Sequence, residues 1–233
     1  MRRLIVAAAA ASLLVTSCGA PEGPIVYAAA SLHQVLPALE PGATYSFDGS
    51  SGLVDQLAGG ATADVFASAD QRSMDRAVEE GLIDGEPRMF ATNHLVLVVP
   101  TGNPAGVTGL DASLDGAKLV ICAEEVPCGA ATARLAEVNG VVLNPVSEET
   151  KVTDVLGKIA SGEGDAGLVY ATDAAGSDAV EVLEVPGALE DPNTYWVAVV
   201  RGAPHPEDAR AYVAALTGEW ADQMAGFGFG PAR

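Results

Sequence analysis

The sequence has few basic side chains: Lys and Arg number 12 against 31 Asp and Glu, which gives a formal net charge of −19 over 233 residues. Proteins that bind nucleic acid neutralise phosphates with clustered Lys and Arg, so this composition excludes a nucleic-acid partner. The three cysteines and three histidines show no spacing typical of metal ligands, and no metal cation site is expected. Apolar residues make up 49% of the chain, which predicts a well-packed globular protein.

Signs of catalysis are also scarce. The chain contains no Gly-x-Ser-x-Gly elbow of the kind that presents a nucleophilic serine. His33 lies two residues after Ser31 at an expected helix start, and the other histidines, His94 and His205, are far away in sequence. The sequence therefore predicts a binding protein rather than an enzyme, with a serine hydrolase as the weaker alternative.

The N-terminal segment has the pattern of an export signal. Arg2 and Arg3 precede an apolar run over residues 4–15 that is too short to span a membrane. The run leads into Val-Thr-Ser before Cys18, which resembles a bacterial lipobox. The resemblance implies a lipoprotein signal peptide over residues 1–17, a lipid on Cys18 and a tether over residues 18–23. The protein is then exported and lipid-anchored to the outer face of the cell membrane, the alternative being a plain secretory signal.

Cys122 and Cys128 remain as a pair once Cys18 is assigned to the lipid. An exported protein is exposed to oxidising conditions, so a disulfide between these two cysteines is expected. Two free buried cysteines and a redox-active pair are the alternatives. The spacing does not match the Cys-x-x-Cys motif of redox-active pairs.

The first half of the mature chain alternates short apolar strands with helices. Strands are predicted over residues 24–27, 43–47 and 64–67, and an apolar residue recurs with helical spacing after each of them. This alternation is typical of parallel strand–helix–strand units, in which ligands bind beyond the carboxyl ends of the strands. Ser31 and Ser50 follow two of these strands at the N-cap positions of the expected helices. Both serines should therefore lie at the same edge of the sheet.

A second strand–helix set predicts a second lobe. A long apolar strand over residues 95–99 leaves the first lobe, and further strands are expected over residues 118–122, 141–143, 166–170 and 180–183. A final apolar strand, residues 195–200, returns to the first lobe. The expected fold class is α/β, with lobe 1 formed by residues 24–95 plus 197–233 and lobe 2 by residues 96–196. Two crossing segments would form a hinge, with the ligand in the cleft between the lobes.

Hydrogen-bond donors that carry no charge converge on the expected cleft. They come from helix starts and from the end of one strand: Ser31, Ser50, Cys128, Val152 and Tyr170. A fully ionised oxyanion only accepts hydrogen bonds, so such a donor set suits a dianion such as molybdate, tungstate or sulfate. Hydrogen bonds to a charged group contribute about 1.5–3 kcal/mol each, so several of them can offset the desolvation of the ion. Lys151 is expected on the surface.

Six separated motifs resemble the molybdate-binding proteins of ABC transporters. In chain order they are AAASL (28–32), FDGSSGL (47–53), ADVFASAD (63–70), NHLVLVVP (93–100), VPCG (126–129) and GLVYATDA (167–174). The resemblance covers most of the mature chain and implies a type II periplasmic-binding-protein fold. It also implies oxyanion contacts from the hydroxyls of Ser31, Ser50 and Tyr170 and from the backbone amides of Ser31, Ser50, Cys128 and Val152.

The resemblance further implies a transport role. The protein would capture molybdate or tungstate without a cofactor and deliver it to an ABC-transporter permease in the membrane, acting as a monomer; a binder of another tetrahedral oxyanion, sulfate first, is the alternative. Three features depart from the family pattern. Cys128 stands where relatives often have alanine, Trp196 stands where many have proline, and either Ser50 or Ser51 could supply the hydroxyl.

Overall fold

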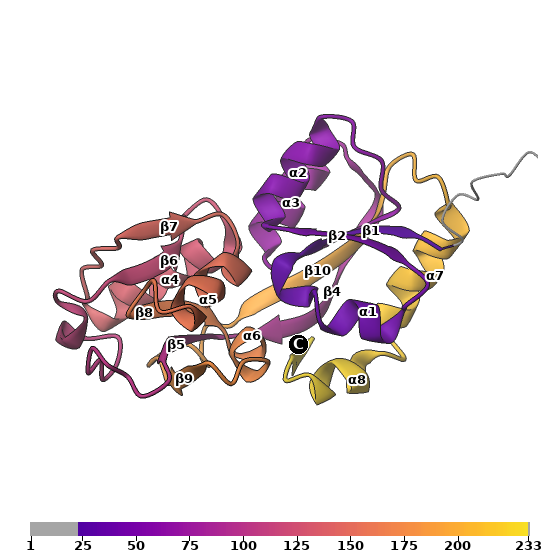
Figure 1. The fold of residues 1–233 in the computed structure, drawn as a ribbon. Coiled ribbons are helices and arrows are strands. Elements are labelled where there is room, and N and C mark those ends of the chain that lie inside the picture. The colour runs from indigo at the N-terminus through magenta and orange to yellow at the C-terminus, as the bar shows by residue number, and fades with distance from the viewer. Residues whose placement is uncertain (1–22, 233) are drawn as a thin grey trace, which may run out of the picture.

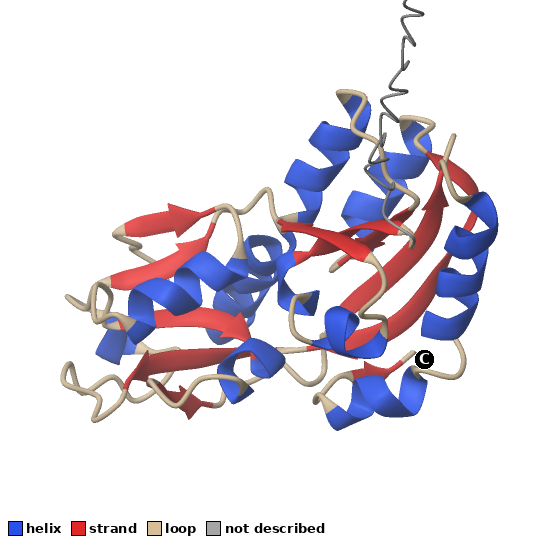
Figure 2. Cartoon of the chain, turned by 45° about the vertical axis from the view of Figure 1, so that its right-hand side comes forward, coloured by secondary structure: helices blue, strands red, loops and turns tan. Residues whose placement is uncertain are grey.

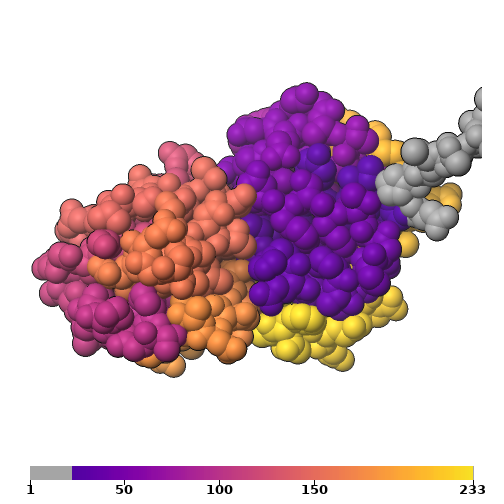
Figure 3. Space-filling view, in the orientation of Figure 1, coloured from indigo at the N-terminus to yellow at the C-terminus, as the bar shows by residue number. Residues whose placement is uncertain are grey.

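The structure is a computed structural model that describes residues 23–232; the predicted signal peptide, the lipidation site Cys18 and most of the tether lie outside these residues. Two sheets with flanking helices form two lobes (Figures 1 and 2). Figure 3 shows the lobes as two bodies that touch along one side. Within the described residues, no helix has both the length and the apolar character needed to cross a membrane.

Lobe 1 contains the larger sheet. Its strands lie in the order β11 (Gly230–Pro231), β4 (Ile83–Asn93), β10 (Asn193–Val200), β3 (Val65–Ser68), β1 (Ile25–Ala29) and β2 (Thr44–Asp48). Its helices are η1 (Ala30–Leu32), α1 (Val35–Leu39), α2 (Ser50–Ala58), α3 (Gln71–Glu79), α7 (Pro206–Leu216) and α8 (Ala221–Gly226). Strand β1 pairs in parallel with both β2 and β3, as the strand–helix alternation predicts. The carboxyl ends of these three strands therefore share one edge of the sheet.

Lobe 2 contains a sheet in the order β7 (Ser147–Glu149), β6 (Leu119–Cys122), β8 (Ala166–Tyr170), β5 (Leu95–Pro100) and β9 (Val180–Leu183). Its helices are η2 (Ala112–Leu114), α4 (Pro127–Asn139), α5 (Val152–Ala160) and α6 (Ala171–Ala175). Strand β8 is buried along its whole length, and β6 pairs with it in parallel. The helices α4, α5 and α6 each begin close to the carboxyl end of a strand in this sheet.

The hinge is compact because the two crossings between the lobes start side by side. Strand β4 ends at Asn93 and β5 begins at Leu95, so only His94 separates the two sheets there. The chain returns to lobe 1 at Asn193, which pairs with Asn93 across the antiparallel β10–β4 ladder. Leu95 thus belongs to the second sheet and residues 193–196 to the first, which shifts both expected lobe limits by a few residues.

The strand prediction for residues 141–143 was wrong, and one strand was not predicted. Residues 141–143 form no strand, and β7 pairs with β6 at that edge of the sheet instead. Gly140 ends α4 in the left-handed conformation, and the chain then runs over the surface with Val142 largely exposed before it pairs with β6. Strand β4 is not among the predicted strands. It begins at the buried Ile83, and the exposed residues that follow, Asp84 to Glu86, carry little apolar signal.

Candidate functional site

A cavity of about 20 Å³ lies between the lobes. Its lining combines loops from lobe 1 with helix starts from lobe 2: Ala29, Ala30, Ser31, Asp48, Gly49, Ser50, Ala69, Val126, Pro127, Cys128, Lys151, Val152 and Tyr170. One water needs about 10–15 Å³ measured in this way, and pockets for drug-sized ligands measure about 300–1,000 Å³. A cavity of this size suits a small ion better than a drug-sized ligand. All five residues that the sequence placed in the cleft line it.

The lobes touch each other around this cavity. Arg72 on α3 donates through Nη2 to the carbonyl oxygens of Glu124 (3.0 Å) and Glu125 (2.8 Å) in lobe 2. Gly49 packs so closely on lobe 2 that a β-carbon built on it would lie 2.2 Å from the carbonyl oxygen of Thr150. The structure therefore shows the cleft in a closed arrangement.

Ser31 is held differently from the predicted N-cap. The short helix η1 begins after Ala29, and Ser31 is its second residue, without a capping bond from its side chain. Its Oγ instead lies 2.9 Å from the phenolic oxygen of Tyr195 on β10, in a buried contact. The N-cap prediction was wrong because the chain turns two residues earlier than the apolar spacing suggested, at Ala29. A strand of the same lobe, rather than the local backbone, positions this hydroxyl.

Ser50 is also inside its helix rather than at the cap. Gly49 occupies the N-cap of α2, and Ser50 is the first helical residue, only 1% exposed. Its Oγ accepts a hydrogen bond of 3.0 Å from the backbone N–H of Ala69. Because the oxygen accepts there, its own proton remains available for another partner. Ser50, and not the neighbouring Ser51, lines the cavity.

Lobe 2 contributes two helix N-termini. Cys128 is the second residue of α4 and Val152 the first residue of α5. The first N–H groups of a helix have no partner within the helix and bear a partial positive charge, which favours an anion in front of them. Both residues line the cavity together with Ser31 and Ser50 of lobe 1, and a backbone donor does not depend on the side chain that position 128 carries.

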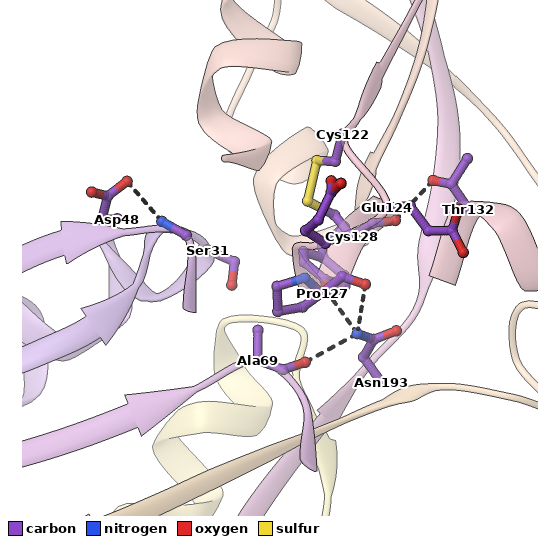
Figure 4. Close-up of a disulfide and its surroundings, with 12 residues drawn as sticks. Ser31, Asp48, Ala69, Cys122, Glu124, Pro127, Cys128, Thr132 and Asn193 are labelled. Carbon is purple, nitrogen blue, oxygen red and sulfur yellow. Dashed lines mark hydrogen bonds between the residues drawn. A yellow bond between two sulfur atoms is a disulfide. The ribbon is translucent and has the colours of Figure 1, made fainter. Parts of the chain in front are cut away.

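The expected disulfide between Cys122 and Cys128 is present (Figure 4). It joins the end of β6 to the first turn of α4 and encloses the turn that carries the carbonyls bound by Arg72. Gly129 follows, and a β-carbon there would lie 1.8 Å from the carbonyl oxygen of Ala123. The bond and the glycine together hold the N-terminus of α4 close to the sheet of lobe 2.

Removing the disulfide is expected to lower the free energy of unfolding by about 2 kcal/mol, the chain-entropy value for so short a loop. The double variant Cys122→Ser, Cys128→Ser should therefore unfold at a lower urea concentration than the oxidised wild type. The wild type with reductant should match the variant, and reductant should not affect the variant. Equal urea midpoints for the variant and the oxidised wild type would show that the bond adds no stability.

Tyr170 ends β8 and is 1% exposed. Its hydroxyl oxygen accepts a hydrogen bond of 2.9 Å from Nδ2 of Asn193. Burial raises the pKa of Tyr170 well above its ordinary value of 10, so the hydroxyl keeps its proton at neutral pH. This residue therefore offers the cavity a neutral donor.

Two charged side chains also line the cavity, which corrects the expectation of an uncharged site. Lys151 is half-buried at the rim, 3.9 Å from the carboxylate of Asp154, rather than fully on the surface. Asp48 ends β2, and its oxygens accept from the N–H of Gly49 (2.8 Å) and from Nε2 of Gln56 (3.0 Å). Asp48 follows the predicted strand over residues 43–47, and this position could have identified it as a residue of the site.

Asn193 is a further residue that sequence reasoning missed. Its amide is 5% exposed and lies where the chain re-enters lobe 1, between Ala69 and Pro127 (Figure 4). It contacts Tyr170 as well, so it joins both lobes beside the cavity. Only its contacts with residues distant in sequence reveal the role of Asn193, because a single asparagine at the start of a strand carries no sequence signal.

Two lobes joined at a compact hinge, with a small donor-lined cavity between them, define a solute-binding protein of the periplasmic type. The chain belongs to the family described as bacterial extracellular solute-binding proteins, whose model matches residues 13–227.

Similar proteins include the molybdate-binding protein ModA of Mycobacterium tuberculosis, 43% identical over 204 residues that cover 83% of this chain and 78% of that protein. A putative ABC transporter substrate-binding lipoprotein, YvgL of Bacillus subtilis, is 30% identical over 70% of this chain and 66% of its own length. Among solved structures, the periplasmic molybdate-binding protein of Azotobacter vinelandii aligns with a TM-score of 0.79 at 19% identity, covering 90% of this chain and 100% of that one. This likeness supports the two-lobed fold.

Proposed function

We propose that the protein captures molybdate or tungstate in the cleft and delivers it to an ABC transporter. The observation that carries the proposal is the convergence of neutral donors from both lobes on a cavity of small-ion size. The 43% identity to a protein named for molybdate binding supports the same ligand. The ion would be held by the hydroxyls of Ser31, Ser50 and Tyr170 and by the backbone amides of Ser31, Ser50, Cys128 and Val152.

The donors are matched to the protonation state of the ligand. Molybdate, tungstate and sulfate are fully ionised at neutral pH and present only acceptors. Each hydrogen bond to such a charged group contributes about 1.5–3 kcal/mol, so donors from two lobes can offset the desolvation of the ion. Lys151 at the rim adds a positive charge, and Asp48 is turned toward the start of α2, where Gly49 and Gln56 bind it.

Catalysis is not part of the proposed function. A serine nucleophile would need a base, and none of the three histidines lines the cavity. His33 directs Nδ1 to the carbonyl oxygen of Ala30, and His205 contacts Asp64, far from the cavity in lobe 1. No cofactor is proposed, because the ion itself is the cargo.

The remaining features concern cellular context. We propose that Cys18 bears a lipid and holds the protein at the outer face of the membrane, next to its permease; the lipoprotein name of the Bacillus relative supports this. The protein is proposed to act as a monomer, because both halves of the cleft come from one chain. Mass spectrometry of the membrane fraction tests the lipid on Cys18.

Titration calorimetry of the chain lacking residues 1–18 tests the ligand. Molybdate and tungstate are expected to bind tightly and sulfate weakly, since the larger tetrahedra would reach donors on both lobes. A preference for sulfate in direct competition would support the alternative function. No heat with any of the three ions, at protein concentrations well above micromolar, would overturn the proposal.

The variant Tyr170→Phe is expected to lose about 1–3 kcal/mol of binding free energy, because it removes one donor to a charged ligand and leaves the ring in place. Calorimetry with sodium molybdate measures the loss. Tyr27→Phe removes a hydroxyl from β1 in lobe 1, outside the cavity lining, and serves as the control. Unchanged affinity in Tyr170→Phe would remove Tyr170 from the site.

A further inference from the structure

The amide of Asn193 contacts both lobes next to the residues that line the cavity. Its Nδ2 lies 3.0 Å from the carbonyl oxygen of Ala69 in lobe 1 and 2.9 Å from the hydroxyl oxygen of Tyr170 in lobe 2. A longer contact of 3.4 Å reaches the carbonyl oxygen of Pro127. The side chain is buried, and Figure 4 shows its nitrogen pointing toward Ala69 and Pro127.

These neighbours fix the direction of the amide. A backbone carbonyl can only accept, so the nitrogen, and not the oxygen, of Asn193 must face Ala69. The flipped amide would place its oxygen against two carbonyl oxygens in a buried site, which is strongly unfavourable. Tyr170 therefore meets an N–H donor, and its hydroxyl oxygen accepts.

The direction of this bond decides what Tyr170 offers the ligand. A hydroxyl has one proton, and a donor at its oxygen leaves that proton free to point elsewhere. Tyr170 lines the cavity, so the proton can be directed to an anion there. Ser50 is arranged in the same way, because the N–H of Ala69 donates to its Oγ. The backbone of one residue, Ala69, thus links Ser50 to the amide that orients Tyr170.

We propose that Asn193 is a positioning residue that holds the Tyr170 hydroxyl as a donor toward the bound oxyanion. The inference rests on the proposed function and extends it to a residue outside the cavity lining. Without the amide, the hydroxyl rotates freely and can donate to protein carbonyls instead of the ion. The binding free energy that Tyr170 contributes then depends on Asn193.

A double-mutant cycle measures this dependence. Asn193→Ala is expected to weaken the binding of sodium molybdate about tenfold, the equivalent of one hydrogen bond to a charged group. In the Tyr170→Phe background the same change is expected to weaken binding less than about twofold, because no hydroxyl remains to orient. Asn139→Ala is the control, since Asn139 likewise donates through Nδ2 to two backbone carbonyls, those of Leu135 and Pro186.

Thermal melting without ligand separates orientation from loss of structure. If Asn193→Ala does not fold, Asn193→Leu replaces it in the cycle, because leucine is close to asparagine in volume, carries no charge and has no N–H to donate. Equal losses of affinity in the wild-type and Tyr170→Phe backgrounds would overturn the inference. Wild-type affinity in Tyr170→Phe alone would also overturn it. Absence of oxyanion binding by the wild type would instead overturn the proposed function.

Discussion

The variant Asp173→Asn is expected to gain about 4 kcal/mol in unfolding free energy over the wild type between pH 4 and pH 8. Asp173 lies in α6, is 1% exposed, and neither carboxyl oxygen makes a hydrogen bond with the described residues. Burial raises its pKa from 3.8 to about 7. The folded protein therefore holds a proton that the unfolded chain releases.

The direction of the pH effect on the free energy of unfolding follows from the number of protons that the folded and unfolded states bind. Below about pH 4 the carboxyl is protonated in both states, and it does not alter the folding equilibrium. Between about pH 4 and 7 the unfolded chain binds fewer protons, so the free energy of unfolding falls as the pH rises. Above about pH 7 the folded state holds a buried charge beside Tyr170 and Tyr195, and the loss is complete. Asparagine has no proton to release and avoids this loss.

Urea denaturation at pH 4, 6 and 8 measures the effect. Asp75→Asn removes a carboxylate from an exposed position on α3 and is the control; its difference from the wild type is expected to stay small at every pH. A constant difference between Asp173→Asn and the wild type from pH 4 to pH 8 would show that Asp173 titrates alike in both states.

Gly49→Ala is expected to weaken molybdate binding about tenfold to a hundredfold, corresponding to an overpacking cost of about 1–3 kcal/mol. Gly49 has φ −61° and ψ 138°, which alanine adopts without strain, so lobe 1 itself tolerates the methyl group. The obstacle is in lobe 2, where the carbonyl oxygen of Thr150 lies 2.2 Å from the position of the new carbon. The methyl group opposes closure and leaves each lobe folded.

Gly52→Ala is the matched control on the same helix. A β-carbon at Gly52 meets its nearest neighbour, Oδ2 of Asp48, at 3.8 Å, which is an ordinary contact. Alanine inside a helix is favoured over glycine by roughly 0.5–1 kcal/mol, so this variant should melt slightly higher and bind normally. Calorimetry and small-angle scattering with and without molybdate compare the two. Normal affinity in Gly49→Ala would show that binding does not require this contact.

The sequence predicted the architecture well because the signals are local. Apolar runs bounded by glycine and polar residues predicted β3, β6 and β8 close to the bounds observed. The disulfide was predicted from the oxidising environment of an exported protein and from the two cysteines that remain once Cys18 is assigned to the lipid. Alternation of strands and helices then placed both serines at one edge of the sheet, which the parallel pairing of β1 with β2 and β3 bears out.

What the sequence could not supply depends on contacts between distant residues. Tyr195 positions Ser31 from 164 residues away, and Asn193 reaches Ala69 across 124 residues. The periodicity of apolar residues carries no information about such distant pairs. It also placed Ser31 and Ser50 at N-cap positions, which Ala29 and Gly49 occupy in the structure. The charged rim formed by Asp48 and Lys151 escaped prediction because the packing between the lobes, rather than residue type, decides which side chains reach the cavity.

The pairing of Asn93 with Asn193 has a mechanical consequence. Because both connecting segments leave lobe 1 at one cross-strand pair, lobe 2 is joined at a single point and not at two separated ones. Two links that start together restrict the motion to one dominant angle, with little sliding. A single pair of spectroscopic labels, one on each lobe, is then expected to report the whole closing movement as one distance coordinate.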